Sequence, residues 1–431
     1  MVFEIDRAAF AYMLCILLCL EVHMNKQTAF LVSLIRHELC RRRLILQAIE
    51  DNENYLLRAG ALLQQRRPRR SVWMKIRDRS FWDRVVLQEY TDEDWRCNFR
   101  MSRRTFDKLC GLMSEVMKPE DVTFRAPIPL PMRVAIVLYK LASCAENRVV
   151  ANTFGVSKST VKRLVYLFCR GMVSSVIKNI IRMPTAEEAI AIARRFQQKF
   201  HIPQIIGCID GTHIPVLPPT DGYRDFVNRK GWPSYVLQAV VDDKYRFWSL
   251  SCKLPGSAHD ANVLRQSQLF RQAHLLPKGP REINGVTINH FLLGDPAYPL
   301  MDWLMKGYTP SPHITPEQEL FNVYLSSART TVEIAFERLK ARWTVLMKRS
   351  DFHFTFSPYM IATCCALHNL CEDEKESLNP TWTAEASVFE SATPQPGVRA
   401  YNAPDNAAGQ RIRDALADYL SANFPLRTPL V

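Results

Sequence analysis

The chain has 431 residues with a hydrophobic content of 47%, which is ample for a folded core and predicts two or three domains. Its 12 cysteines are scattered through apolar stretches, which argues against a secreted disulfide scaffold and for a reduced intracellular compartment. The net charge of +13 belongs to the N-terminal half, because residues 1–200 carry 34 Lys and Arg against 20 Asp and Glu, whereas residues 201–431 carry 22 against 23. Such asymmetry suggests a polyanionic partner, most often a nucleic acid.

Residues 1–72 are predicted to form a basic, helical N-terminal extension. Its apolar stretch Ala8–Leu20 is shorter than the ~20 residues that a membrane span needs, and its acidic flanks do not suit a signal peptide. A packed helix is therefore the simpler interpretation, and we expect no membrane partner. The run Arg66–Arg70 fits either a solvated linker or a nuclear-localisation or nucleic-acid patch, and the sequence leaves both open.

Residues 73–200 are predicted to form a helical DNA-binding region with a helix-turn-helix motif near residues 148–166. Gly155 can supply a turn with positive φ, and Ser157 is a natural N-cap for the helix that follows. The second helix of such a motif contacts the major groove with its N-terminal residues, although two helices around a glycine also occur in proteins that do not bind DNA. The residues that we expect to contact DNA are Lys158, Ser159, Thr160 and Lys162.

From about residue 203 the pattern changes from helices to strands, which predicts an α/β domain, a mixed sheet with helices packed against it, over residues 201–372. The expected elements are a strand over 205–210, a hairpin over 235–241 and 247–252, a helix over 263–270, a strand over 291–295, and helices over 326–347 and 358–371. Residues 373–431 should form a linker, over 374–405, and a last helix over 410–420. The sequence contains no glycine-rich phosphate-binding motif, so we expect no nucleotide cofactor.

Three acidic residues stand in settings that a shared site would explain. Asp210 and Asp295 each end a short apolar run, and Glu333 lies on a later, basic helical segment. A carboxylate at the end of a buried strand is costly unless a cation meets it, and Mg²⁺ prefers carboxylate oxygens completed by water or phosphate. The pattern therefore predicts a site for Mg²⁺ or Mn²⁺. Two alternatives stay open: the aspartates could cap turns, and Glu333 could pair with Arg329 one helical turn before it.

Several strings of residues, taken in order, resemble the Harbinger transposase-derived nuclease family, the relatives of PIF-type transposases. They are Gly207–Pro215, Asn228–Gly231, Gln238–Val240, Gly256–Asp260, Gly294–Leu300, Val332–Lys340 and Leu367–Leu370. The resemblance implies an RNase H-like catalytic domain whose DDE triad binds divalent metal and hydrolyses DNA phosphodiester bonds by a two-metal mechanism. By matching positions, the catalytic and metal-binding residues are Asp210, Asp295 and Glu333.

The neighbourhood of the triad supplies further candidates. Residues expected to orient ligands or only to hold loops are His213, His259, Asp260 and Glu337, the last at a position where the family commonly has Gly. Residues expected to contact the DNA backbone are Lys230, Arg329, Arg338 and Lys340, because phosphate binding is largely the work of Lys and Arg.

The partners and the location follow from the same resemblance. We expect DNA as a partner, and relatives use a separate Myb-like protein to reach DNA or the nucleus. We expect the nucleus as location, with the cytoplasm open, and the sequence leaves homo-oligomerisation open. The rival interpretation is a domesticated, catalytically inert nuclear protein that binds DNA or recruits partners.

Overall fold

The computed structural model describes residues 31–40, 77–118, 127–349, 352–401 and 404–425, with the single positions Ile16, Arg43 and Gln47. The chain divides into two units, residues 1–76 and 77–431. In the first unit, residues 31–40 are helical. The predicted helix over residues 8–20, apart from Ile16, and the basic run over residues 66–70 lie outside the described residues. Among the helices that the structure describes, none has the length and apolar character needed to cross a bilayer.

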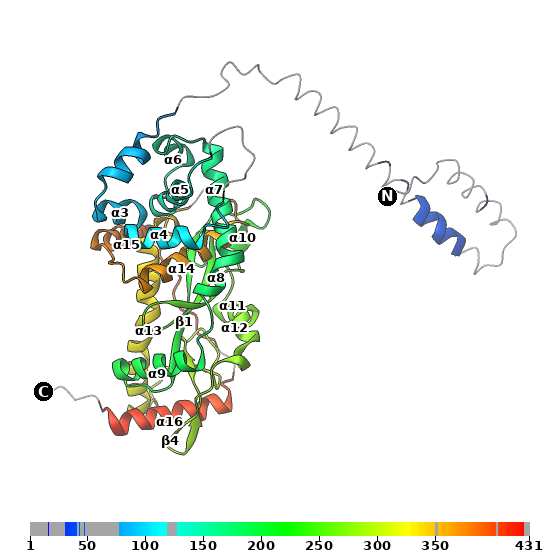
Figure 1. The fold of residues 1–431 in the computed structure, drawn as a ribbon. Helices are drawn as coiled ribbons and strands as arrows, with labels where there is room; N and C mark the ends of the chain where they lie inside the picture. Colours follow the sequence, from blue (N-terminus) through cyan, green and yellow to red (C-terminus); the bar gives the residue numbers. More distant parts are fainter. Residues whose placement is uncertain are drawn as a thin grey trace. The chain divides into compact units, whose positions relative to one another are not determined.

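The second unit begins with helices that surround α5. In chain order they are η2 (Phe81–Glu89), α3 (Asp92–Phe99), α4 (Arg103–Leu112), α5 (Leu130–Ser143), α6 (Asn147–Thr153), α7 (Lys158–Gly171), η3 (Met172–Val176), α8 (Ile177–Ile180) and α9 (Ala186–Phe200). The middle of α5 is buried on every side, as expected for a helix that is apolar all round. Figure 1 shows α3, α4, α6 and α7 around it.

The predicted pair of short helices around Gly155 is present as α6 and α7. Gly155 has a φ of +59°, and a Cβ added to it would lie 2.0 Å from the backbone oxygen of Asp78, so the position requires glycine. Ser157 caps α7, because its Oγ accepts a hydrogen bond of 3.0 Å from the backbone N–H of Thr160. The role of this pair as a DNA-binding helix-turn-helix motif stays a prediction.

A five-stranded mixed sheet forms the centre of the C-terminal part, in the order β3-β2-β1-β6-β7. The strands are β1 (Ile205–Pro215), β2 (Ser234–Val241), β3 (Phe247–Ser251), β6 (Phe291–Leu293) and β7 (Leu304–Met305), and β4 (Arg281–Ile283) and β5 (Val286–Ile288) form a separate pair. β1, β2 and β3 are antiparallel, whereas β6 and β7 run parallel to β1. The predicted α/β class, strands and hairpin are confirmed.

The remaining helices differ from the predictions at three places. They are α10 (Tyr223–Phe226), α11 (Asp260–Gln266), α12 (Gln268–Arg271), η4 (Ala273–Leu275), α13 (Pro316–Arg342), η5 (Thr344–Leu346), α14 (Ser357–Asp373), α15 (Pro380–Ala392) and α16 (Ala407–Asn423). The helix predicted over 263–270 is split at Ser267, whose side chain caps α12. α13 begins early, because Thr315 and Gln318 form a capping box. The predicted linker contains α15, of which only Trp382 and Ala386 are buried, too few to show a periodic pattern.

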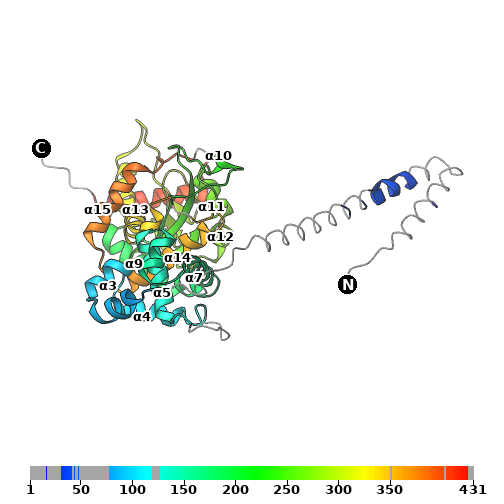
Figure 2. The same cartoon turned by 90° about the horizontal axis from the view of Figure 1, so that it is seen from above.

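The two faces of the sheet are covered by different helices. Successive side chains of β1 alternate between the faces. Ile209 packs in a cluster with Ala189 of α9 and Leu264 of α11, whereas Cys208 belongs to the larger cluster that contains α13 and α14. Figures 1 and 2 show α13 on one side of the strands and α11 and α12 on the other. The residues that follow Cys208 and Ile209 on β1 are therefore directed at these two layers in turn.

Candidate active site

Asp210 and Asp295 occupy neighbouring positions on two parallel chains. β1 pairs with β6 so that Cys208 lies opposite Leu293, and two residues further along each chain come Asp210 and Asp295. Because side chains alternate, both aspartates are expected on the face of Cys208 and Leu293, which α13 covers.

One detail of the prediction is wrong. Asp210 does not end its strand, since β1 continues to Pro215 in antiparallel pairing with β2. Asp210 lies where the parallel partner stops and the antiparallel partner continues.

Glu333 reaches the aspartates through Arg329, which lies between them. The thiol of Cys208 donates a 3.4 Å hydrogen bond to the backbone oxygen of Ala328, so this turn of α13 lies directly on β1. Arg329 Nη2 then lies 3.0 Å from Asp210 Oδ2 and 3.0 Å from Glu333 Oε1. The Arg329 side chain is 13% exposed and that of Glu333 is 53% exposed, so Glu333 stands at the rim of the site. The structure thus contains the ion pair between Glu333 and Arg329 that the sequence offered as an alternative to metal binding.

A third aspartate, Asp260, approaches from the other face of the sheet. Asp260 begins α11, and a Cβ added to Gly211 would lie 2.6 Å from Asp260 Oδ1. The absence of a side chain at Gly211 thus lets this carboxylate lie next to the backbone that carries Asp210. Asp260, which the sequence predicts only as an orienting or loop-holding residue, therefore lies beside the backbone of the aspartate pair.

Burial and the charge of Asp210 raise the pKa values of the other two aspartates. Burial raises the pKa of Asp295 to about 7, and the Asp210 charge adds to this increase while Arg329 opposes it. Burial raises the pKa of Asp260 to about 6, again with a contribution from Asp210. Burial also raises the pKa of Asp210, against the effects of Arg329 and of the Gly211 N–H. Arg329 therefore compensates only part of the charge that the cluster would carry near neutral pH.

Two buried residues that we did not predict connect this cluster. Gln238 Nε2 donates to the Tyr298 hydroxyl at 3.0 Å and to the backbone oxygen of Asp260 at 3.2 Å. Tyr298 is fully buried, and burial, followed by the charges of the three aspartates, raises its pKa well above the usual value. Both residues belong to the strings that carry the family resemblance, which is the signal that could have identified them.

The aspartates also serve the turns around them. Asp295 Oδ1 accepts a 2.9 Å hydrogen bond from the Ala297 N–H, and Asp210 Oδ1 accepts one of 2.7 Å from the Gly211 N–H. The turn-capping alternative is thus present together with the cluster. His259 caps α11 with its Nδ1.

His213 is not placed to bind a metal as it stands. Its Nδ1 lies 2.9 Å from Ser234 Oγ, and burial, with help from Arg229 and Lys340, lowers its pKa to about 4. Arg229, which we did not single out, also lowers the pKa of Asp260, so its charge acts on the cluster.

Two of the predicted DNA-backbone contacts are used inside the protein instead. Lys340 is buried, and its Nζ lies 2.7 Å from Glu390 Oε1 on α15, a helix that we had not predicted. Arg338 forms a bidentate ion pair with Glu372. Lys230 and Glu337, in contrast, are exposed.

The predicted recognition residues lie at the start of α7. Lys158, Ser159 and Lys162 are exposed there, as a DNA contact requires. Thr160 is half-buried, and its hydroxyl lies 2.7 Å from Ser157 Oγ, so its side chain belongs to the helix cap. Arg163, which we did not predict, is exposed on the same helix.

The chemistry of the cluster suits a divalent cation, although the geometry is not assembled. Among the described residues, no three His, Cys, Asp or Glu side chains are placed to hold one ion. The two aspartates are nevertheless carboxylates with little solvent exposure, and a hard cation would relieve their mutual repulsion. Arg329 binds Asp210 Oδ2 and Glu333 Oε1, two oxygens that a metal would need. The residues therefore fit a metal once Arg329 has moved.

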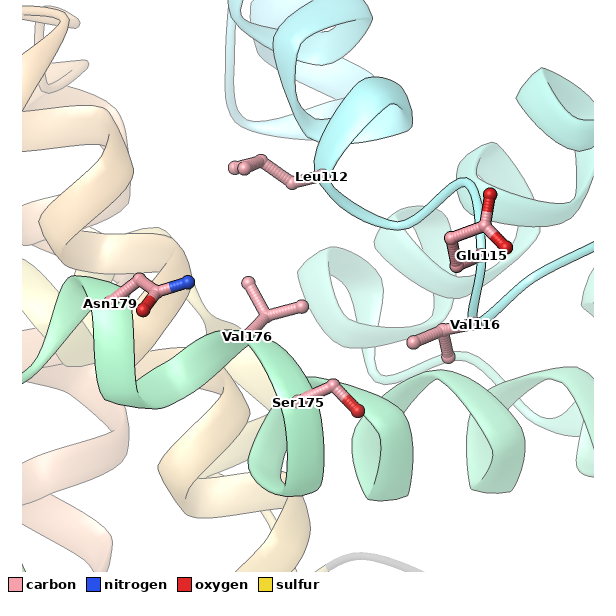
Figure 3. A pocket seen from close by; sticks show the side chains of 6 residues that line it. All are labelled: Leu112, Glu115, Val116, Ser175, Val176 and Asn179. Carbon is pink, nitrogen blue, oxygen red and sulfur yellow. The ribbon is translucent and has the colours of Figure 1, made fainter.

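A pocket of about 380 Å³ lies away from the acidic cluster, between the end of α4 and η3 with α8 (Figure 3). It is lined by Leu112, Glu115, Val116, Ser175, Val176 and Asn179. Glu115 is the one charged side chain among these residues, so the pocket offers no convergent set of catalytic groups.

Comparisons with known proteins identify the family to which the chain is similar. Residues 209–369 match the family model described as DDE superfamily endonuclease. The protein ALP1-like of Arabidopsis thaliana is 31% identical over 302 residues, which cover 64% of this chain and 70% of that protein. Antagonist of Like Heterochromatin Protein 1 of the same plant is 29% identical, over 69% of this chain and 79% of its own length. The Homo sapiens protein named "Putative nuclease HARBI1" is 27% identical, over 67% of this chain and 80% of its own length. No solved structure matches the chain significantly.

The raised pKa of Asp295 predicts how stability depends on pH without metal. The pKa of Asp295 is about 7 in the folded protein against an ordinary value of 3.8, so the preference of the fold for the protonated carboxyl contributes its full stability below about pH 4. That stability is lost as the pH rises through about 7. Asp295→Asn, which stays neutral, should therefore unfold a few degrees above wild type at pH 8 in EDTA, about 1–3 kcal/mol, with a much smaller difference at pH 5.

Differential scanning calorimetry at both pH values measures this difference. Asp302→Asn, at an exposed position, is the control and should behave as wild type. An Asp295→Asn protein that unfolds no later than wild type at pH 8 would contradict the assignment of a repelled, buried carboxyl.

Proposed function

We propose a nuclease function for this chain, which belongs to the Harbinger transposase-derived family of DDE superfamily endonucleases. In this proposal the chain is an endonuclease that hydrolyses DNA phosphodiester bonds with divalent metal. The observation that carries it is the pair Asp210 and Asp295, the first partly buried and the second buried, which the parallel pairing of β1 with β6 brings side by side under a helix that carries Glu333. The strand order, three antiparallel strands followed by two parallel ones, supports the RNase H-like architecture that the family resemblance implies.

The residues that would hold Mg²⁺ or Mn²⁺ are Asp210, Asp295 and Glu333. A bound divalent cation supplies charge stabilisation for the attacking and leaving oxygens and lowers the pKa of the attacking water. The chain's own part is to keep the carboxylates together in a site from which most water is excluded. Arg329 must leave Asp210 and Glu333 for this to happen, and its guanidinium would then be free to contact the phosphate, as its sequence position suggests.

DNA would be held by the basic helical part as well as by the acidic site. The exposed Lys158 and Lys162 on α7, and the basic balance of residues 1–200, support this part of the proposal. We also propose a nuclear location, since a DNA substrate requires it in a cell with a nucleus, and a Myb-like accessory protein as a further partner.

A second candidate function is that of a catalytically inert protein that binds DNA or recruits partners. The observation that favours it is that Arg329 forms ion pairs with both Asp210 and Glu333 and so occupies carboxylate oxygens of two of the three acids. One relative is named an antagonist of Like Heterochromatin Protein 1, a name that describes no nuclease.

Metal binding separates the two functions. Calorimetric titration of the full-length chain with Mn²⁺ should show binding that is lost, by more than about ten-fold in affinity, in the Asp210→Asn/Asp295→Asn variant, because both anionic ligands are neutralised. The Asp302→Asn variant should bind like wild type. Equal binding in all three folded proteins, or none in wild type, contradicts the nuclease proposal and favours the inert scaffold.

Arg329 should compete with the metal for the same carboxylate oxygens. Replacing it by Gln removes one positive charge next to Asp210, so Mn²⁺ affinity should rise on the order of ten-fold, since a unit charge at this range contributes ~1–4 kcal/mol. The matched control is Arg338→Gln on the same helix, which breaks the ion pair with Glu372 and should leave the affinity unchanged. Weaker or equal Mn²⁺ binding by a folded Arg329→Gln protein would contradict the competition.

The start of α7 should contribute to DNA binding through phosphate contacts. Lys158→Ala/Lys162→Ala should weaken the binding of duplex DNA and reduce the slope of log K against log salt by about two, since each phosphate contact contributes ~0.9. Fluorescence anisotropy at several salt concentrations measures both quantities. Lys244→Ala/Lys278→Ala, which removes two exposed charges outside the helical part, is the control. If the two double variants show the same loss, α7 is not the DNA-binding element.

A further inference from the structure

The segment Pro394–Tyr401 connects α15 to α16 and lies outside the residues that match the endonuclease family. Figure 1 shows α15 beside the helical part and α16 at the opposite end of the same unit, next to β4. The connection must therefore pass along the sheet that carries the acids. We call residues 394–401 the strap.

Gln395 attaches the strap to β1 immediately after Asp210. Its Oε1 accepts hydrogen bonds from the His213 N–H at 2.9 Å and from the Thr212 hydroxyl at 3.2 Å, and its Nε2 donates to the His213 oxygen at 3.3 Å. In the described sheet the pairing of β1 with β6 stops at Cys208, which leaves the outer edge of β1 without a strand partner. The Gln395 amide supplies the donor and the acceptor that a strand would otherwise supply.

Tyr401 attaches the other end of the strap beside the remaining two aspartates. Its backbone N–H donates a 2.8 Å hydrogen bond to the oxygen of Pro296, the residue after Asp295. Its ring centroid lies 6.5 Å from that of His259, the residue before Asp260, and its hydroxyl accepts a hydrogen bond from Arg265. The strap therefore contacts a neighbour of each aspartate.

The strap is held by polar contacts and not by apolar burial. None of the residues 394–401 is buried, whereas both flanking helices are anchored by buried apolar side chains such as Trp382 and Leu416. Hydrogen bonds at a solvated surface contribute only about 0.5–1.5 kcal/mol each, so the strap can open while α15 and α16 stay packed. At the same time Asp295 is 3% exposed, too little for a phosphodiester in a duplex to reach it.

We propose that residues 394–401 are an internal cover of the aspartate cluster and that DNA displaces this cover when it binds. The proposal rests on the proposed function, because it takes DNA as the ligand of this face. The strap competes with DNA for the same face, which lowers the affinity of the closed protein and keeps the acids out of contact with nucleic acid until the strap opens.

The test uses the full-length chain and the variant Gln395→Ala/Tyr401→Ala, which removes the side-chain contacts at both ends of the strap. A duplex of arbitrary sequence, about 30 base pairs long, is the probe, and fluorescence anisotropy in EDTA gives its affinity. The variant should bind the duplex about ten-fold more tightly than wild type, since two to four surface hydrogen bonds no longer oppose binding. The control is Tyr308→Phe, which loses the hydrogen bond to Asp414 of α16 but leaves the strap in place and should bind as wild type.

Hydrogen exchange identifies the mechanism. In wild type, the duplex should increase amide exchange over residues 394–401 and at His213, and the double variant should show faster exchange there without DNA. Equal affinities for wild type and the double variant, protection of the strap by DNA, or no DNA binding by either protein overturns the proposal. If the double variant does not fold, Trp232→Phe, which removes only the hydrogen bond from Trp232 Nε1 to the Pro394 oxygen, should still speed exchange of the strap, and unchanged exchange overturns the proposal as well.

The outcome is distinguishable from that of the nuclease proposal. If Mn²⁺ binding depends on Asp210 and Asp295 but DNA does not displace the strap, the proposal of a cover is rejected and the nuclease proposal stands. If DNA displaces the strap but the protein does not bind Mn²⁺, the nuclease proposal is rejected and the proposal of a covered DNA-binding face stands.

Discussion

The constraint on which this structure depends is the repulsion among three neighbouring aspartates at the sheet, of which Asp295 is buried and the other two are partly buried. Parallel pairing of β1 with β6 brings Asp210 next to Asp295, and Gly211 lets Asp260 approach from the opposite face. Such an arrangement is stable only with protons or a cation. The chain supplies Arg329 beside Asp210 and the more distant charge of Arg229, and protonation provides the rest, as the raised pKa values of Asp260 and Asp295 indicate. The folded protein therefore contains a site in which the nearby positive charge does not balance the carboxylates.

That shortage explains why the acids differ in how firmly they are held. The three aspartates are fixed by strands, turns and the start of a helix, whereas Glu333 is half-exposed and is tied to Arg329 by an i,i+4 ion pair. Any cation that satisfies the aspartates better than Arg329 frees Arg329 and Glu333 together, because one nitrogen binds both Asp210 and Glu333. The variable part of the site is therefore a single helical turn of α13, and the aspartates form its rigid part.

Much of this arrangement could be predicted from sequence, and the rest could not for identifiable reasons. Apolar runs that end in Asp-Gly or Gly-Asp predicted strands over residues 205–210 and 291–295, and the structure has Asp210 within β1 and Asp295 two residues beyond the end of β6. The same pattern suggested a site shared by Asp210, Asp295 and Glu333, and the resemblance to transposase-derived nucleases implied the catalytic role of the three acids. Lys340 could not be assigned correctly, because its partner Glu390 lies on a helix with few buried residues that looked like a linker. The contacts of Gln395 could not be predicted either, because a side-chain amide in a segment rich in polar residues carries no periodic signal.

The geometry of β1 links the chemistry of the site to its covering. β1 loses its parallel partner after Cys208, and this loss is what leaves room on that side for the carboxylates and for α13 to reach them. The same loss leaves the His213 N–H and C=O without a strand partner, and backbone groups in that position must be satisfied by a side chain, by water or by another chain. Gln395 satisfies both. The strand edge beside the acidic cluster is thus covered by the contacts of one amide and one tyrosine, and in our proposal these contacts are weak enough to be exchanged for a ligand. A strand in the position of the strap would have sealed the cluster permanently, and a bare edge would have left β1 open to pairing with other chains.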